Sequence, residues 1–281
     1  MYFYQNKIAF ITGGSSGIGL AVAKALAKEG CTVVVFAREE TKLKQATDEI
    51  KSVANTKTII KYYTVDTTDN IAVKFCLDMA VRENGIPDIL INCVGIAQPN
   101  YFENISFESF DKTIKTNLYS TWSVVHTLLP YLKIKGGQIV NTSSIAGFLG
   151  VFGYTDYCMS KFGIIGFSEA LRSELKQHHI KVQVLCPPDT DTPGFEAENK
   201  NKPDETKAIA GNAKLLSPDM VAMALLKGMK KNKFLILPGF DGKLTRFLKR
   251  FFPWLIDLVM EVNIKKAQKQ LNHNEIKLKP K

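Results

Sequence analysis

An alternation of short apolar segments with stretches of helical periodicity is the feature that most constrains the fold. The apolar segments have the length and β-branched content of strands, at residues 8–12, 32–36, 59–65, 89–92, 138–142 and 182–185. Helical spacing occupies residues 20–28, 41–53, 71–83, 107–132 and 157–178 between them. Strands that are apolar throughout and alternate with helices are typical of βαβ units, in which helices cover both faces of a parallel sheet. We therefore predict a single α/β domain with a doubly wound parallel sheet.

The chain changes character after Cys186. Residues 188–218 are rich in Pro, Asp, Glu, Lys, Asn and Thr, and we expect a long substrate loop with at most one short helix. A helix at residues 219–229, capped by Ser217 with Pro218 in its first turn, and a last strand at 234–237 follow. We divide the chain into a catalytic domain at residues 1–242 and an extension at 243–281, whose end is a polar, Lys-rich tail.

Composition excludes several classes of protein. With 45% hydrophobic residues the chain buries a core, so global disorder is excluded. The 37 basic and 27 acidic residues give a net charge of +10, and residues 1–200 hold 20 of each, so the whole excess lies in residues 201–281. Five cysteines without a CxxC pair and four scattered histidines predict neither a disulfide framework nor a metal site. We expect no secretory signal. The sequence has no apolar stretch of about 18 residues, so we expect no membrane-spanning helix.

A glycine-rich turn links the first strand to the first helix. Glycines permit tight backbone geometry and close approach of a pyrophosphate, and the N-terminus of a helix offers amide donors and a favourable dipole. The alternative is an ordinary strand-to-helix turn, but the position in the first βαβ unit favours a Rossmann-type dinucleotide site. The residues that we predict to bind the cofactor there are Gly13, Ser15, Ser16, Gly17, Ile18 and Gly19.

The residues after the second and third strands bear on which dinucleotide binds. An acidic residue after the second strand hydrogen-bonds the ribose of NAD, whereas an arginine pairs with the 2′-phosphate of NADP. Arg38 follows this strand and no carboxylate occupies the strand tip, so we predict NADP(H), with a merely solvated Arg38 as the alternative. Asp66 follows the third strand and either contacts the adenine or caps the next helix.

Tyr157 and Lys161 are four residues apart in a predicted helix, so their side chains share one face. A phenol has a pKa of about 10 and transfers protons poorly at neutral pH unless a cation stabilises the phenolate. We expect the Lys161 ammonium to lower the pKa of Tyr157 toward the range useful for general acid–base catalysis. This pair alone is commonly structural, and its combination with Ser144 and with the glycine turn favours catalysis.

Together these motifs resemble the short-chain dehydrogenase/reductase family over about residues 5–240. Residues 12–19 match its TGxxxGxG turn, and residues 92–95 (NCVG) match its NNAG segment imperfectly. The resemblance implies a catalytic set of Asn117, Ser144, Tyr157 and Lys161, and cofactor contacts by Asn92 and Gly95. In such a set Ser144 binds the substrate carbonyl oxygen, Tyr157 protonates it as hydride arrives, Lys161 holds the nicotinamide ribose, and Asn117 positions a relay water. Ser143 competes for the serine role, but the family's offset of thirteen residues to the tyrosine selects Ser144.

Residues 187–195 narrow the resemblance. Their sequence, PPDTDTPGF, is similar to that of 3-ketodihydrosphingosine reductases, a subfamily of sphingolipid biosynthesis. This resemblance implies cofactor contacts by Pro187, Thr190 and Thr192 and NADPH-dependent reduction of a long-chain amino ketone. A steroid or 3-oxoacyl thioester reductase is the alternative among enzymes, and a non-catalytic dinucleotide-binding scaffold is the alternative outside them.

Residues 243–262 combine a basic flank with a stretch rich in Phe, Trp and Leu. The apolar part is too short to span a bilayer, and suits a helix at a membrane surface or a shallow hairpin around Pro253. The alternative is a helix packed on the catalytic body or on a partner subunit. We expect a homo-oligomer at the cytosolic face of a membrane. The basic residues form no nucleic-acid-binding module, so we predict no nucleic-acid partner.

Overall fold

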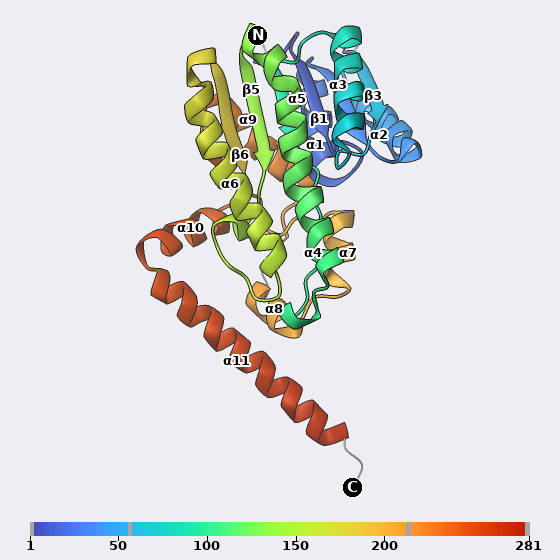
Figure 1. Cartoon of the computed structure of the whole chain (residues 1–281). Coiled ribbons are helices and arrows are strands. Elements are labelled where there is room, and N and C mark those ends of the chain that lie inside the picture. The colour runs from blue at the N-terminus through green and yellow to red at the C-terminus, as the bar shows by residue number, and fades with distance from the viewer. Residues whose placement is uncertain (1–2, 56–57, 212–214, 279–281) are drawn as a thin grey trace.

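A seven-stranded parallel sheet forms the centre of the structure (Figure 1). The computed structural model describes residues 3–55, 58–211 and 215–278, with side chains up to residue 271. The strands are β1 Ile8–Thr12, β2 Thr32–Ala37, β3 Ile60–Thr64, β4 Ile89–Asn92, β5 Gly137–Thr142, β6 Ile180–Leu185 and β7 Leu235–Ile236. The main helices of the body are α1 Gly17–Lys28, α2 Glu40–Val53, α3 Asn70–Asn84, α4 Phe107–Ile114, α5 Ser120–Lys135, α6 Thr155–Leu175 and α9 Pro218–Lys230. Short 3₁₀ turns lie at Phe102–Asn104, Ile145–Gly147 and Lys176–His178.

The strand order is β3-β2-β1-β4-β5-β6-β7, and every strand pair is parallel. The predicted strands are confirmed, with bounds that differ by one or two residues. Thr12 lies opposite both Phe36 and Asn92, so the carboxyl ends of the central strands meet at one edge. The order reverses between β3 and β4, on the two sides of β1. In sheets of this kind the ligand crevice lies outside the carboxyl ends at such a switch point.

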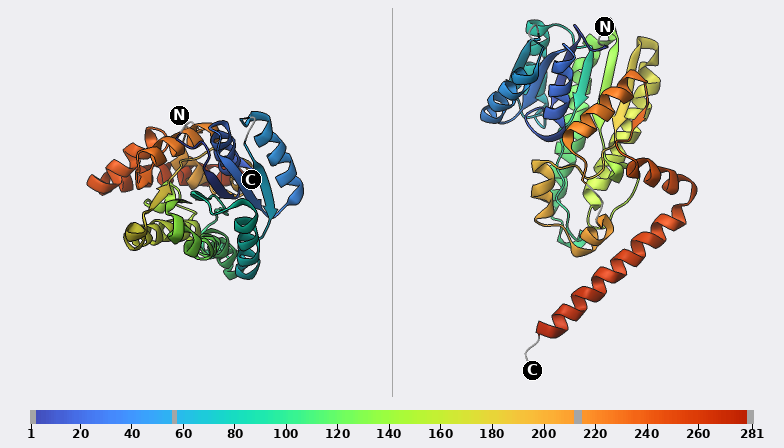
Figure 2. Two further views of the ribbon diagram at one scale, coloured as in Figure 1. Left: turned by 90° about the horizontal axis from the view of Figure 1, so that it is seen from above. Right: turned by 180° about the vertical axis from the view of Figure 1, so that it is seen from behind.

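Helices cover both faces of the sheet, as the views in Figures 1 and 2 show. Helices α1, α2 and α9 pack on one face, and α3, α5 and α6 on the other. The two apolar clusters between sheet and helices explain why the strands have no polar face. Tyr4 adds a long-range tie, because its buried hydroxyl donates to the carbonyl of Leu226 at 2.7 Å.

The predicted long helix at residues 107–132 is interrupted. Residues 115–119 form a π-helical turn, η2, between α4 and α5. A π-turn widens the helix by one residue and is frequent at functional sites. Sequence periodicity did not reveal it, because the apolar spacing continues on both sides.

The region after β6 is more helical than predicted. Residues 188–218 contain two short helices, α7 Pro193–Asn199 and α8 Asp204–Ala210, and a bridge pairs Thr190 with Leu216. The C-terminal part forms α10 Asp241–Phe251 and α11 Pro253–Leu278, so the expected polar tail is helical up to Leu278. Helix α11 packs against α8 and then extends away from the body (Figure 2). Within the described ranges, no helix has the length and apolarity needed to cross a membrane.

Gly19 shows how tightly α1 packs on the glycine turn. A Cβ at this position would collide with the carbonyl oxygen of Gly13 and lie 2.8 Å from its carbonyl carbon. A Cβ at Gly166, in α6, would meet nothing within 4 Å.

We therefore expect Gly19→Ala and Gly166→Ala to change stability in opposite directions. Helix propensity favours alanine by about 1 kcal/mol at both sites, and overpacking at Gly19 should reverse this to a loss of about 1–3 kcal/mol. Urea unfolding of both variants gives the two free energies. Equal stability of the two variants would contradict the packing that we describe.

Candidate active site

A cleft of about 930 Å³ lies at the carboxyl edge of the sheet, between the strand ends and the helices that follow β6. It gathers most of the predicted site residues from separate parts of the chain. Those that line it are Gly13, Ser15, Ser16, Gly17, Ile18, Gly19, Arg38, Asp66, Gly95, Ser144, Tyr157, Lys161, Pro187, Thr190 and Thr192. Asn92 and Asn117 do not line it.

Two reciprocal hydrogen bonds fasten α6 to the end of β5. The Lys161 ammonium donates to the carbonyl of Thr142 at 3.1 Å, and the Ser143 hydroxyl donates to the carbonyl of Lys161 at 2.8 Å. Ser143 is thereby buried in a structural role. The adjacent Ser144 faces the cleft and hydrogen-bonds Tyr157. The geometry therefore selects Ser144 over Ser143 as the serine that can meet a substrate.

The two titratable groups of the set respond to burial in opposite ways. Desolvation raises the pKa of Tyr157, the charge of Glu198 adds to that rise, and the hydrogen bond with Ser144 opposes it. Burial lowers the pKa of Lys161 to about 8, because desolvation disfavours the ammonium. The Tyr157 pKa is therefore raised overall, and the prediction that it is lowered is wrong for this structure, because burial outweighs the Lys161 ammonium 5.5 Å from the phenol ring centroid. Tyr157 is a protonated phenol at neutral pH, and can donate a proton.

Asn117 sits in the π-turn and is fully buried. Its Oδ1 accepts from the Ile96 amide at 2.8 Å, while its Nδ2 donates to the Ile96 carbonyl and to the Ser160 hydroxyl at 3.0 and 2.9 Å. These contacts occupy both polar atoms of the side chain. Asn117 therefore holds the Gly95–Ile96 segment beside the cleft, and its role toward a relay water stays a prediction.

The glycine turn fits the pyrophosphate of a dinucleotide. Gly13 and Gly17 have φ values of +69° and +51°, in the left-handed region that favours glycine. A Cβ at Gly13 would lie 2.9 Å from the Cys93 carbonyl carbon, so the cradle admits no side chain. Ser16 is the N-cap residue of α1, and its side chain makes no capping hydrogen bond. The first amide groups of the helix, at the edge of the cleft, thus have no capping side chain, as an anion site requires.

Two basic side chains lie where the adenosine end of a dinucleotide would bind. Arg38, which follows β2, is exposed and forms no ion pair or hydrogen bond with a described residue. Lys42 also lines the cleft, and its ammonium contacts the Glu39 carboxylate at 2.8 Å. Sequence reasoning missed Lys42, because no motif distinguishes it from the other lysines of α2.

Several other predicted residues hold the fold of the cleft. Asp66 accepts from the amide and the hydroxyl of Thr68, and Asp69, not Asp66, caps α3. The Asn92 side chain is buried and donates to Asn141 at 2.9 Å, so it does not reach the cleft.

The two threonines of the loop after β6 also make internal hydrogen bonds. Thr190 donates to the Pro188 carbonyl at 2.8 Å, and Thr192 caps α7 by accepting from the Phe195 amide at 3.1 Å. Thr192 lies against Gly17, because a Cβ there would be 3.1 Å from its Cγ2. The loop thus reaches across to the glycine turn.

A charged cluster beside Tyr157 has no counterpart in the predicted site. The Tyr154 hydroxyl donates to Oε1 of Glu198, and the Lys202 ammonium lies 3.1 Å from the same oxygen. All three residues line the cleft. The Tyr154 and Tyr157 ring centroids are 5.6 Å apart, so the cluster adjoins the reacting groups.

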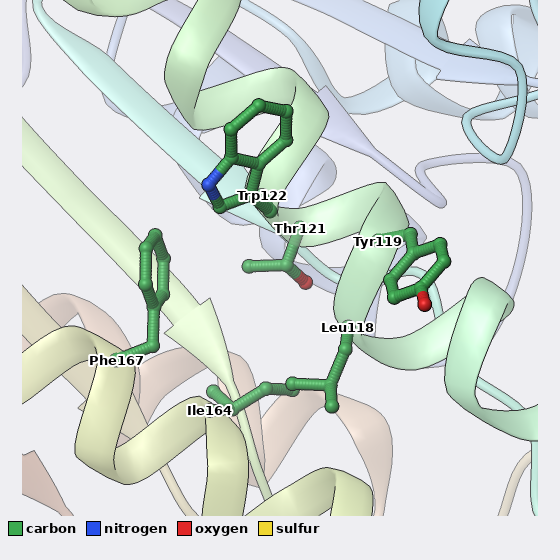
Figure 3. Close-up of a pocket in the computed structure, with 6 residues that line it drawn as sticks. All are labelled: Leu118, Tyr119, Thr121, Trp122, Ile164 and Phe167. Atoms are coloured by element: carbon green, nitrogen blue, oxygen red, sulfur yellow. The ribbon is translucent and has the colours of Figure 1, made fainter.

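A separate apolar pocket of about 470 Å³ lies between η2, α5 and α6, on the outside of the helical layer (Figure 3). It is lined by Leu118, Tyr119, Thr121, Trp122, Ile164 and Phe167. None of these side chains is a proton donor of the catalytic set, and the pocket carries no ionised group. We therefore assign the chemistry to the larger cleft.

Comparison with known proteins agrees with the geometry. Residues 7–203 match the family described as short chain dehydrogenase. The chain is 38% identical over 260 residues to a 3-ketodihydrosphingosine reductase of Dictyostelium discoideum, covering 87% of this chain and 78% of that protein. It is 39% identical over 238 residues to a 3-dehydrosphinganine reductase of Danio rerio, covering 83% and 71%.

Solved structures share the fold. The structure of a variant of actinorhodin polyketide ketoreductase with NADPH aligns with a TM-score of 0.75 at 26% identity. The alignment covers 84% of this chain and 96% of that one. Levodione reductase aligns with a TM-score of 0.78 at 21% identity, covering 86% and 99%, which shows the fold alone. The family match, the relatives and the assembled Ser144, Tyr157 and Lys161 agree. The chain belongs to the short-chain dehydrogenase/reductase family and is an oxidoreductase.

Proposed function

We propose that this protein reduces the 3-keto group of 3-ketodihydrosphingosine to dihydrosphingosine with NADPH. The observation that carries this proposal is a complete Ser144, Tyr157 and Lys161 set in a chain that is similar, over more than four fifths of its length, to 3-ketodihydrosphingosine reductases. A non-catalytic scaffold is disfavoured, because folding does not require a serine, a tyrosine and a lysine to meet in a cleft.

In the proposed reduction, Ser144 positions the substrate and Tyr157 transfers the proton. The Ser144 hydroxyl donates to the substrate carbonyl oxygen and holds it beside the Tyr157 phenol. A bound nicotinamide dinucleotide supplies the hydride to the carbonyl carbon. Tyr157 gives its proton to the oxygen as the C=O bond becomes CH–OH, and the phenolate regains a proton from water. Lys161 is still mostly an ammonium at pH 7, since its pKa is about 8, and stabilises the phenolate when it forms.

NADPH is the cofactor that suits the basic side chains after β2. The 2′-phosphate distinguishes NADPH from NADH, and an arginine without an internal partner is suited to pair with it. Arg38 meets this condition, and Lys42 lies on the same stretch of the cleft wall.

The C-terminal extension suits a membrane surface. Helices α10 and α11, with the residue between them, expose a set of large apolar side chains: Phe247, Phe251, Phe252, Trp254, Leu258, Val259 and Val262. Basic residues Lys243, Arg246, Lys249 and Arg250 accompany them in α10. Phe240 and Met260 line the cleft, so this apolar edge adjoins its mouth. We propose that residues 1–242 form the catalytic domain and that 243–281 dock it at the cytosolic face of a membrane, from which a lipid ketone enters.

The outer pocket between α5 and α6 suits a second copy of this chain. Tyr119 and Trp122 beside it are 53% and 48% exposed. An apolar surface of this kind is more often an interface than free surface. We propose a homo-oligomer that buries this face.

The substrate assignment predicts a selectivity. In detergent micelles, NADPH consumption with 3-ketodihydrosphingosine should exceed that with a steroid ketone, a 3-oxoacyl thioester or a short ketone by at least about ten-fold in kcat/KM, since only the first combines the long chain with the polar head. The assay follows NADPH absorbance. Faster turnover of the thioester or the steroid would contradict the proposed substrate and identify the faster compound as the better candidate.

Arg38→Ala should affect the two dinucleotides differently. Loss of a charge-assisted hydrogen bond to phosphate should raise the KM for NADPH by about 10- to 100-fold and leave the KM for NADH within about three-fold. Arg82→Ala, at an exposed arginine of α3 outside the cleft, is the matched control. Equal changes in the KM for NADPH and for NADH would contradict an interaction of Arg38 with the 2′-phosphate.

Membrane docking is tested by substituting the exposed aromatics. The double variant Phe251→Ser, Trp254→Ser should co-sediment with anionic vesicles about ten-fold less than the wild type, and high salt should weaken the wild type as well. Phe75→Ser, at an 81% exposed residue of α3, is the control. Deletion of the extension is a poorer test, since α11 packs on α8. A wild type that stays in the supernatant would contradict docking.

Oligomerisation is tested at Trp122. A charge in an apolar interface is strongly unfavourable, so Trp122→Lys should lower the sedimentation coefficient from that of an oligomer to that of a 31 kDa monomer. Ile134→Lys, at the other end of α5, should leave it unchanged. A wild type that is already monomeric would contradict the interface.

A further inference from the structure

Glu198 occupies an unusual position for a carboxylate. It belongs to α7, lines the cleft, and its side chain is only 15% exposed. Burial of a carboxylate is unfavourable unless it is paired, and a paired, perturbed group in a cleft is a candidate for function. Burial raises the pKa of Glu198, and the Tyr154 hydrogen bond and Lys202 oppose that rise.

The internal partners of Glu198 occupy only one of its two oxygens. The Tyr154 hydroxyl and the Lys202 ammonium, at 3.1 Å, both contact Oε1. Oε2 accepts no hydrogen bond from any described residue, and it is not among the buried side-chain atoms that lack a hydrogen-bond partner, so it is not fully enclosed by protein. The carboxylate is thus held in place through one oxygen and presents the other to the cleft.

Glu198 lies near the Tyr157 phenol, which is the group proposed to meet the substrate carbonyl. Tyr154, which holds Glu198, has its ring centroid 5.6 Å from that of Tyr157. The negative charges of Glu198 and Asp189 both raise the pKa of Tyr157, so both act on the place where the substrate oxygen binds. The charged side chains that the segment after β6 contributes to the cleft are Asp189, Glu198, Lys202 and Asp241, three acids against one base. This wall favours a cationic ligand group.

We propose that Oε2 of Glu198 binds the protonated 2-amine of the substrate. This inference rests on the proposed function, because the amine belongs to the long-chain 2-amino ketone named there. The amine is carried by the carbon next to the carbonyl, so it can reach Glu198 while the carbonyl oxygen stays at Ser144 and Tyr157. Lys202 and Tyr154 orient the carboxylate, and Asp189 adds negative potential. Glu198 is thus a specificity-determining residue: it strengthens binding of a ketone that carries the amine and leaves binding of a neutral ketone unchanged.

The test compares two long-chain ketones, 3-ketodihydrosphingosine and its analogue without the 2-amino group. The wild type should prefer the amino ketone by at least about ten-fold in kcat/KM. Glu198→Gln keeps the shape and an acceptor for Tyr154, and should lose about 10- to 100-fold with the amino ketone and less than about three-fold with the analogue. Glu196→Gln, at an exposed residue of the same helix outside the cleft, should change neither value.

The outcomes separate this inference from the proposed function. Equal losses of Glu198→Gln with both ketones would overturn the inference, since they would mean that Glu198 only supports α7. A wild type that reduces neither long-chain ketone would overturn the proposed function instead. If Glu198→Gln does not fold, inhibition of the wild type decides. Dodecylammonium should inhibit at least about ten-fold more strongly than dodecanol, and equal inhibition would overturn the inference.

Discussion

The site depends on the attachment of α6 to the end of β5. The Lys161 ammonium of α6 donates to the Thr142 carbonyl at the end of β5, and the Ser143 hydroxyl donates to the Lys161 carbonyl in α6. Together these two bonds fix the rotation of the helix about its axis. That rotation brings Tyr157, one turn before Lys161, to the hydroxyl of Ser144. Ser160 extends the attachment by accepting from Asn117 in the π-turn, which in turn holds Ile96. Buried polar groups that are paired in this way favour a single arrangement.

The two ends of the cleft carry different charged groups, which suits two different ligands. Near β2, Lys42 is paired with Glu39, and Arg38 remains without an ionic partner among the described residues, available to a dinucleotide phosphate. Acidic Asp189 and Glu198 lie across the sheet, in the segment after β6. The net charge of +10 belongs to neither end, because its excess lies in residues 201–281, and the extension at 243–281 holds ten basic and three acidic residues. We read the three regions as cofactor, substrate and membrane contacts.

The sheet and the reacting groups could be predicted from the sequence because both depend on local patterns. Apolar runs marked the strands, and a spacing of four placed Tyr157 and Lys161 on one helix face. The π-turn and the burial of Asn92 could not be predicted, since each depends on which partner lies nearby in the fold. The cap of α3 was a local signal that was missed, because Asp69 accepts from the amides of Ile71 and Ala72. Glu198 was missed for the same reason: a carboxylate in a polar loop has no local sign that it points into a cleft.

The most direct test of the account is single-turnover reduction of 3-ketodihydrosphingosine by Tyr157→Phe. The account assigns Tyr157 to proton donation and cofactor binding mainly to other residues. The variant should therefore bind NADPH within about three-fold of the wild type, by fluorescence titration, while its single-turnover rate falls by about 10²- to 10⁴-fold. A variant that binds NADPH normally and keeps the wild-type rate would contradict the account.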